Sequence, residues 1–210
     1  MVYELKSRKE EMKTVKNMTK YSLLKELNAI QDSGRESRVK VTKKVLKDQE
    51  LFQSLIEIAF EQKNDLSVKA IWVLELVCEK RLDWLAFNLT YFIESLPTII
   101  HDESAIRSIA KICNLVAQDY NSKFESPIKL TITQDQVSQM IETGFDWLLS
   151  DYKVATKAHA METLYYLGIK TGWIHYELKM IIEKNLPAES PGYATRAKKV
   201  LDSMSKNTAA

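Results

Sequence analysis

The chain has 210 residues, of which 45% are apolar and 28% are charged, and its formal net charge is +2. The near balance of 30 basic and 28 acidic side chains gives no large uniform field for nucleic acid or anionic lipid. Five Gly and four Pro are few for folds that need many tight turns, which disfavours β-sandwiches, barrels and α/β folds. We therefore expect an all-α protein of long helices and short loops.

The two termini and the cysteines bear on location. Residues 1–20 are rich in charge and lack the apolar run of a secretory signal, so we expect a charged tail or a peripheral helix there. Residues 205–210 should form a frayed C-terminus. Cys78 and Cys113 both lie in apolar helical patterns, which favours buried free thiols and a cytoplasmic location.

Apolar residues recur at spacings of three and four from Tyr21 onward, which predicts helices along the chain. The clearest example is the stripe of Ile106, Ile109, Cys113 and Val116. Five antiparallel helix pairs are expected: 21–30 with 36–46, 50–61 with 67–80, 84–96 with 104–119, 134–149 with 152–168, and 174–185 with 192–204. The best strand candidate, Ile128–Thr133, is short.

A degenerate repeat marks the second helix of several pairs. Asp65-Leu-Ser-Val-Lys-Ala has the pattern Asp-x-x-Val-basic-small, and Asp151-Tyr-Lys-Val begins in the same way. One helix pair cannot cover its own apolar face, whereas a stack of pairs forms a continuous core. The repeat therefore predicts one stacked domain over residues 21–204.

Several segments resemble HEAT repeats and a group of short bacterial proteins of the ARM/HEAT fold. They are Ser67–Cys78, Ile106–Leu115, Phe145–Leu149, Val154–Met161 and Trp173–Ile182. The resemblance implies an all-α, right-handed α-α superhelix of about five helix pairs, with the second helices on its concave side.

Members of that group often carry the label adenylosuccinate lyase, which would imply a role in purine biosynthesis. True adenylosuccinate lyases have a flexible Ser-Ser-x-Met-Pro-x-Lys-x-Asn-Pro loop and catalytic histidines. The nearest string here, Asp202–Asn207, lacks the prolines. Acid–base catalysis needs a donor and an acceptor around one pocket, and no such set is apparent, so we expect no catalytic residues.

A basic row occupies equivalent places in successive second helices and consists of Lys69, Arg107, Lys157 and Arg196. One interpretation is a structural ladder, in which Asp65, Asp102 and Asp151 cap helices and pair with basic residues of neighbouring repeats. The other is a concave basic stripe that holds an acidic peptide or a phosphate.

Two further sets of side chains extend the candidate binding surface. Trp72, Glu75 and Glu79 share one edge of their helix, and a Trp beside carboxylates is a frequent anchor for a partner. Lys111 and Asn114 follow Arg107 at helical spacing. The candidate partner-binding residues are therefore Lys69, Trp72, Glu75, Arg107, Lys111, Asn114, Lys157 and Arg196.

Motifs of known chemistry are missing from the sequence. It contains no His-x-x-x-His, Cys-x-x-Cys, phosphate loop or Gly-x-Ser-x-Gly elbow, so we expect no metal site and no cofactor. The favoured function is a non-enzymatic interaction module that binds another protein on the concave face. The alternatives are nucleic-acid binding, as in HEAT-like DNA-repair proteins, and a lyase-labelled or accessory role in purine biosynthesis. The sequence leaves the oligomeric state open.

Overall fold

The computed structural model describes residues 20–31, 34–61, 64–99 and 101–208, and the side chains as far as 206. Helices are the regular structure throughout these residues, which confirms the all-α prediction. The described chain divides into two compact units, with the boundary after Trp84. The predicted tail lies outside the described residues except for Lys20.

Unit 1 contains a helix over residues 20–28 and three more: α2 (Arg35–Val45), α3 (Glu50–Glu61) and α4 (Asp65–Cys78). Helix α4 packs against both α2 and α3 and buries side chains on nearly every side. This is the pattern expected of a helix with neighbours on several faces. The thiol of Cys78 is buried and free, and burial raises its pKa.

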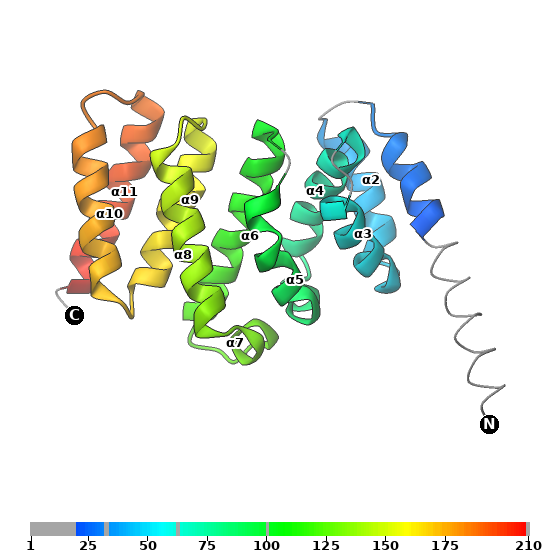
Figure 1. Ribbon diagram of the computed structural model, residues 1–210, viewed down its shortest axis with the longest axis horizontal. Helices are drawn as coiled ribbons and strands as arrows, with labels where there is room; N and C mark the ends of the chain where they lie inside the picture. Colours follow the sequence, from blue (N-terminus) through cyan, green and yellow to red (C-terminus); the bar gives the residue numbers. More distant parts are fainter. Residues whose placement is uncertain (1–19, 32–33, 62–63, 100, 209–210) are drawn as a thin grey trace. The chain divides into compact units, whose positions relative to one another are not determined.

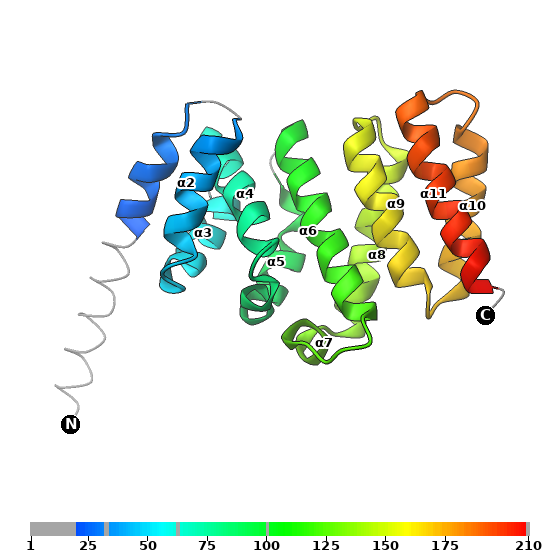
Figure 2. The same ribbon diagram turned by 180° about the vertical axis from the view of Figure 1, so that it is seen from behind.

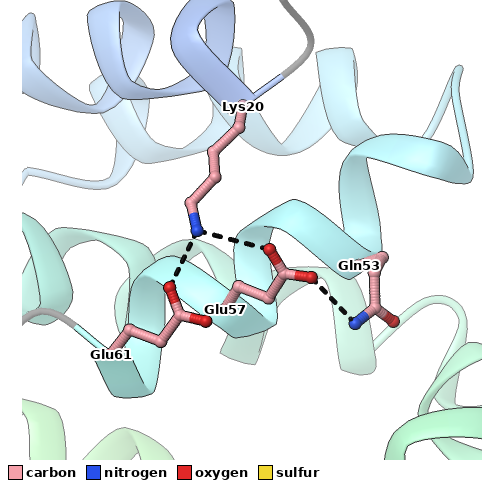
Figure 3. Close-up of polar contacts among 4 residues, drawn as sticks. All are labelled: Lys20, Gln53, Glu57 and Glu61. Atoms are coloured by element: carbon pink, nitrogen blue, oxygen red, sulfur yellow. Dashed lines mark hydrogen bonds and ion pairs between the residues drawn. The ribbon is translucent and has the colours of Figure 1, made fainter. Parts of the chain in front are cut away.

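An ion-pair cluster fixes the start of the first described helix to α3 (Figure 3). Lys20 Nζ lies 2.8 Å from Glu61 Oε2 and 3.3 Å from Glu57 Oε2, and Gln53 donates to Glu57 Oε1 at 3.2 Å. Burial lowers the pKa of Lys20, but hydrogen bonds to Glu61 and Glu57 outweigh it and raise this pKa above its ordinary value.

Unit 2 contains the elements from Leu85 onward, and its long helices lie in two layers (Figures 1 and 2). Figure 2 shows α6 (Glu103–Asn121), α9 (Val154–Gly168) and α11 (Pro191–Thr208) in front. Figure 1 shows α8 (Gln134–Leu149) and α10 (Gly172–Asn185) in front. Helix α9 packs against all four of these neighbours and forms the centre of the core.

The prediction of one continuous helix over residues 84–96 is wrong. A 3₁₀ helix η1 (Leu82–Asn88), a short α5 (Leu89–Glu94) and a second 3₁₀ turn η2 (Leu96–Thr98) take its place. Trp84, Leu85 and Ala86 are consecutive and all buried, so this segment has no polar face that would mark one continuous helix.

Ile128–Thr133 is also not a strand. Its first four residues belong to α7 (Pro127–Thr131), which begins with a capping serine followed by a proline. The side chain of Ser126 accepts a hydrogen bond from Lys129 N, and Pro127 occupies a first-turn position where its missing N–H costs nothing. The Ser-Pro start signal therefore outweighs the short alternating pattern.

The predicted aspartate caps are confirmed at only one of three positions. Asp102 accepts from Ser104 N and Ala105 N at 2.9 Å each and caps α6. Burial raises the pKa of Asp102, but the bonds from Ser104 and Ala105, with nearby Lys153, hold this pKa below its ordinary value.

The other two aspartates do not cap helices. Asn64 caps α4 with its side chain, which places Asp65 inside the first turn. Lys153 occupies the N-cap position of α9 and makes no side-chain capping bond, so Asp151 lies outside that helix.

Cys113 in α6 is buried and free like Cys78, and burial raises the pKa of its thiol too. No helix within the described ranges is both long enough and apolar enough to cross a membrane. Helix α11 continues through residues 205–208, beyond its predicted end.

Candidate functional site

The predicted binding residues fall into both units. Lys69, Trp72 and Glu75 lie on α4 of unit 1, and the other five lie on α6, α9 and α11 of unit 2. Three of the eight side chains are buried, namely Glu75, Asn114 and Lys157. A partner on the surface cannot contact these three directly, so their place is in the interior contacts of each unit.

In unit 1 the predicted Trp anchor has a packing partner. The guanidinium carbon of Arg38 on α2 lies 5.6 Å from the ring centre of Trp72, and the side chain of Trp72 is half-buried. Lys69 Nζ donates to the backbone oxygen of Asn28 at 3.5 Å. A cation over an aromatic ring at an exposed site contributes about 0.5–1 kcal/mol. Both residues therefore join neighbouring helices of unit 1.

In unit 2 a polar network crosses the layer of α6, α9 and α11 and is centred on Glu162. Asn114 Nδ2 donates to Glu162 Oε2 at 2.7 Å, and Gln118 donates to Asn114 Oδ1 at 3.0 Å. Lys199 of α11 lies 3.4 Å from Glu162 Oε1. A hydrogen bond to a charged group contributes about 1.5–3 kcal/mol, so the network fixes the three helices to one another.

The basic row is not one uniform stripe. Lys157 Nζ forms an ion pair with Glu189 Oε1 at 2.6 Å and lies 5.9 Å from the ring centre of Tyr193. Arg107 donates to Ser108 Oγ at 3.0 Å, whereas Arg196 is exposed on α11. A glutamate, and none of the three aspartates predicted to pair with the basic row, therefore compensates the charge of Lys157.

A groove of about 570 Å³ lies between α8, η2 and the start of α6, and we call it the α8 groove. Its floor consists of apolar side chains, of which Leu96, Ile106 and Trp147 are buried, whereas Pro97 is exposed and Ile99 and Tyr152 are half-buried. Its rim carries three exposed carboxylates on one face of α8, at Asp135, Glu142 and Asp146.

The walls of the α8 groove are held by hydrogen bonds within unit 2. Gln139, which lines the groove, donates to the backbone oxygen of Ile93 at 3.1 Å. Gln136, one turn earlier on α8, donates to Thr90 Oγ1 at 2.9 Å. Both bonds join α8 to α5, so the acidic face of α8 keeps its position beside η2.

The α8 groove has a negative charge that the described residues leave unpaired. Within the described ranges, none of its three rim carboxylates forms an ion pair with Lys or Arg. Two unit charges 4 Å apart near a protein surface interact by about 4 kcal/mol before desolvation. A cation that enters this groove therefore meets a favourable field above an apolar floor.

The acidic face of α8 could have been recognised from the sequence alone. Asp135, Gln139, Glu142 and Asp146 recur at spacings of four, three and four, which places them on one helix face. Most of the apolar floor comes from residues 96–106, far from α8 in sequence, so the periodicity of α8 alone did not indicate a groove. No group of three or more His, Cys, Asp or Glu side chains that could hold a metal ion is found among the described residues.

Comparison of the chain with protein-family models, with curated proteins and with solved structures gives no match.

Proposed function

We propose that the chain is a non-enzymatic helical-repeat protein of the HEAT/ARM type that binds a basic segment of a partner protein in the α8 groove. The alternation of helices between two layers in unit 2 supports the repeat architecture. The free, buried thiols of Cys78 and Cys113 favour the cytoplasm as its location.

The observation that carries the proposed function is the chemistry of the α8 groove. Lys and Arg side chains have apolar stems and cationic ends, and they bury the stem while the charge stays at the rim. Pro97 is exposed and Ile99 and Tyr152 are half-buried in the groove, so they offer a surface for the stem, and Glu142 and Asp146 lie on the rim. A volume of about 570 Å³ is within the usual range of small binding pockets, which is roughly 300–1,000 Å³.

This proposal moves the binding surface away from the predicted second-helix face. Asn114 and Lys157 on that face are buried in contacts within unit 2. The rim carboxylates of the α8 groove are exposed and lack ion pairs with the described residues. Charge on a rim mainly sets the rate of association and the choice of partner, whereas the apolar floor supplies affinity.

A peptide array tests the proposed function. Basic, neutral and acidic peptides of equal length would be incubated with the full chain and with the variant Glu142→Lys/Asp146→Lys. We expect selective binding of basic peptides that also contain apolar residues, and at least a tenfold loss in the variant, or about 1.4 kcal/mol.

Glu125→Lys is the matched control, because Glu125 is exposed in unit 2 and does not line the groove. Selection of acidic peptides, or equal binding by the double variant and the control, would show that the α8 groove is not the site.

One observation favours nucleic-acid binding as a second candidate. Lys40, Lys43 and Lys47 are exposed at spacings of three and four and line a depression of about 470 Å³ along α2. Lysines that neutralise phosphates make binding strongly dependent on salt.

We expect any retardation of DNA or RNA at low salt to disappear in Lys40→Glu/Lys43→Glu/Lys47→Glu and to persist in Lys123→Glu, an exposed control in unit 2. Absence of retardation by the unaltered chain would end this candidate. No feature of the described residues favours the lyase alternative.

A further inference from the structure

Helix α10 has apolar side chains on two opposite faces. Ile174, Leu178 and Ile182 are fully buried on the face toward α9. On the opposite face Trp173, Tyr176 and Met180 follow one another at spacings of three and four and are 55%, 65% and 51% exposed. A surface helix is normally polar on its outer side, so this outer stripe needs a separate explanation.

The outer stripe continues onto the neighbouring helix α8 (Figure 1). The ring of Trp173 stacks on Phe145 of α8 with 6.2 Å between ring centres, and Leu149, one turn after Phe145, is exposed. We call Phe145, Leu149, Trp173, Tyr176 and Met180 the α10 patch.

The side chains of the α10 patch present on the order of 500 Å² of apolar surface. This area is similar to that of the largest apolar patch on a typical monomer, and such patches are often functional. A standard interface buries about 800 Å² on each partner. With the polar side chains around it, the patch is of the size that a stable dimer needs.

The charges beside the α10 patch repeat with opposite sign along each edge of the helix. Glu177 is followed by Lys184 on one edge. Lys179 is followed by Glu183 on the other edge, where the two lie 3.8 Å apart as an ion pair within the helix, and all four residues are exposed. When two identical helices pack antiparallel about a twofold axis, each edge of one helix lies beside the same edge of its copy. The copy's residues along that edge run in the opposite direction. Each acidic residue then faces a basic residue of the copy.

A single axis satisfies both edges. The pair Glu177 and Lys184 and the pair Lys179 and Glu183 are both centred within one residue of Met180. An axis at this point brings Met180 against its own copy. It also places Trp173 opposite the turn after α10 of the copy, where Pro187 and Ala188 are exposed and apolar. The aromatic end of the patch thus meets an apolar surface.

We propose that the chain forms a twofold-symmetric dimer in which the α10 helices of two copies pack antiparallel about Met180. The α10 patch supplies the apolar contact. The four charged residues select the antiparallel direction and a second copy of this chain over another partner. Such an interface is isologous, so assembly stops at two copies.

Sedimentation velocity of the full chain over a range of concentrations tests this proposal. We expect a dimer of twice 24.2 kDa and a monomer for Met180→Lys, which places two like charges at the axis. We expect at least a tenfold weaker dimer for Glu177→Lys. The new lysine of each copy would face Lys184 of the other copy, so two repulsive pairs would replace two attractive ones.

A charge exchange separates this interface from a general loss of folding. Glu177→Lys/Lys184→Glu restores the opposite charges and should restore most of the affinity, whereas Asp202→Lys, an exposed control on α11, should leave it unchanged. A monomeric unaltered chain at the highest concentration overturns the proposal. So does a dimer that Glu177→Lys does not weaken, or a double variant no tighter than the single one.

Discussion

The close contact between Gly168 and His175 allows a sharp test of how α9 and α10 pack. A Cβ atom at position 168 would lie 2.2 Å from Cδ2 and 2.7 Å from Nε2 of His175. The imidazole cannot move without loss, because its Nε2 is 2.8 Å from the backbone oxygen of Tyr165 and its ring stacks on the Tyr165 ring at 5.5 Å. Gly168→Ala should therefore displace the imidazole.

The cost of Gly168→Ala follows from these contacts. The hydrogen bond contributes about 1 kcal/mol and the stacked pair about 0.5–1.5 kcal/mol. Alanine in a helix recovers about 0.5–1 kcal/mol relative to glycine. If the backbone shifts as well, overpacking costs about 1–3 kcal/mol. The lost contacts and the gain in helix propensity leave a net destabilisation of about 0.5–2 kcal/mol, to which any backbone shift adds.

Urea unfolding followed by circular dichroism measures this cost. Gly172→Ala is the matched control, because a Cβ there meets no atom within 4 Å, and it should be neutral or slightly stabilising. The double variant Gly168→Ala/His175→Ala should be no less stable than the single variant His175→Ala, because the imidazole that obstructs a Cβ atom at position 168 is then absent. Equal unfolding midpoints for Gly168→Ala and Gly172→Ala would refute the predicted contact.

Three further predictions concern caps and the polar network. Asn64→Ala should lower the free energy of unfolding by about 1 kcal/mol through loss of the α4 cap, measured by urea unfolding. Glu162→Ala should cost about 1–3 kcal/mol because it leaves the buried Asn114 amide without its acceptor, and a double-mutant cycle with Asn114→Ala should show coupling between the two residues. The pKa of Asp102 is lower in the folded chain than its ordinary value of 3.8. The ionised carboxylate of Asp102 therefore stabilises the fold above pH 3.8, and this stabilisation is lost as the pH falls through the folded pKa. The stability difference between the unaltered chain and Asp102→Asn should therefore shrink in acid, and a constant difference would contradict the assignment.

The sequence predicted the long helices well because their apolar residues follow helical periodicity without interruption. Helices α3, α8 and α9 begin or end within two residues of the predicted positions. The prediction for residues 84–96 is wrong because periodicity does not distinguish one continuous α-helix from the succession of η1, α5 and η2. At α4, Asn64 and Asp65 are both good capping residues, and only the backbone geometry identifies Asn64 as the cap.

The candidate site was harder to predict than the fold. Glu75 and Asn114 lie on the polar edges of their helices, yet both are buried in the folded chain. Periodicity shows which residues share a face but not whether another helix covers that face. The α8 groove needs both the carboxylates of α8 and the apolar floor that residues 96–106 largely supply. Only tertiary packing brings these together, so local patterns could not locate the groove.

Nuclear magnetic resonance tests the central claim most directly, because it locates the binding surface without substitution. The full chain, labelled with ¹⁵N, would be titrated with the basic peptide that binds most tightly in the array. Binding in the α8 groove predicts the largest amide shift changes at Asp135, Glu142, Asp146 and Trp147. Changes confined to the second-helix face around Arg107 and Lys111, or no change at all, would contradict it.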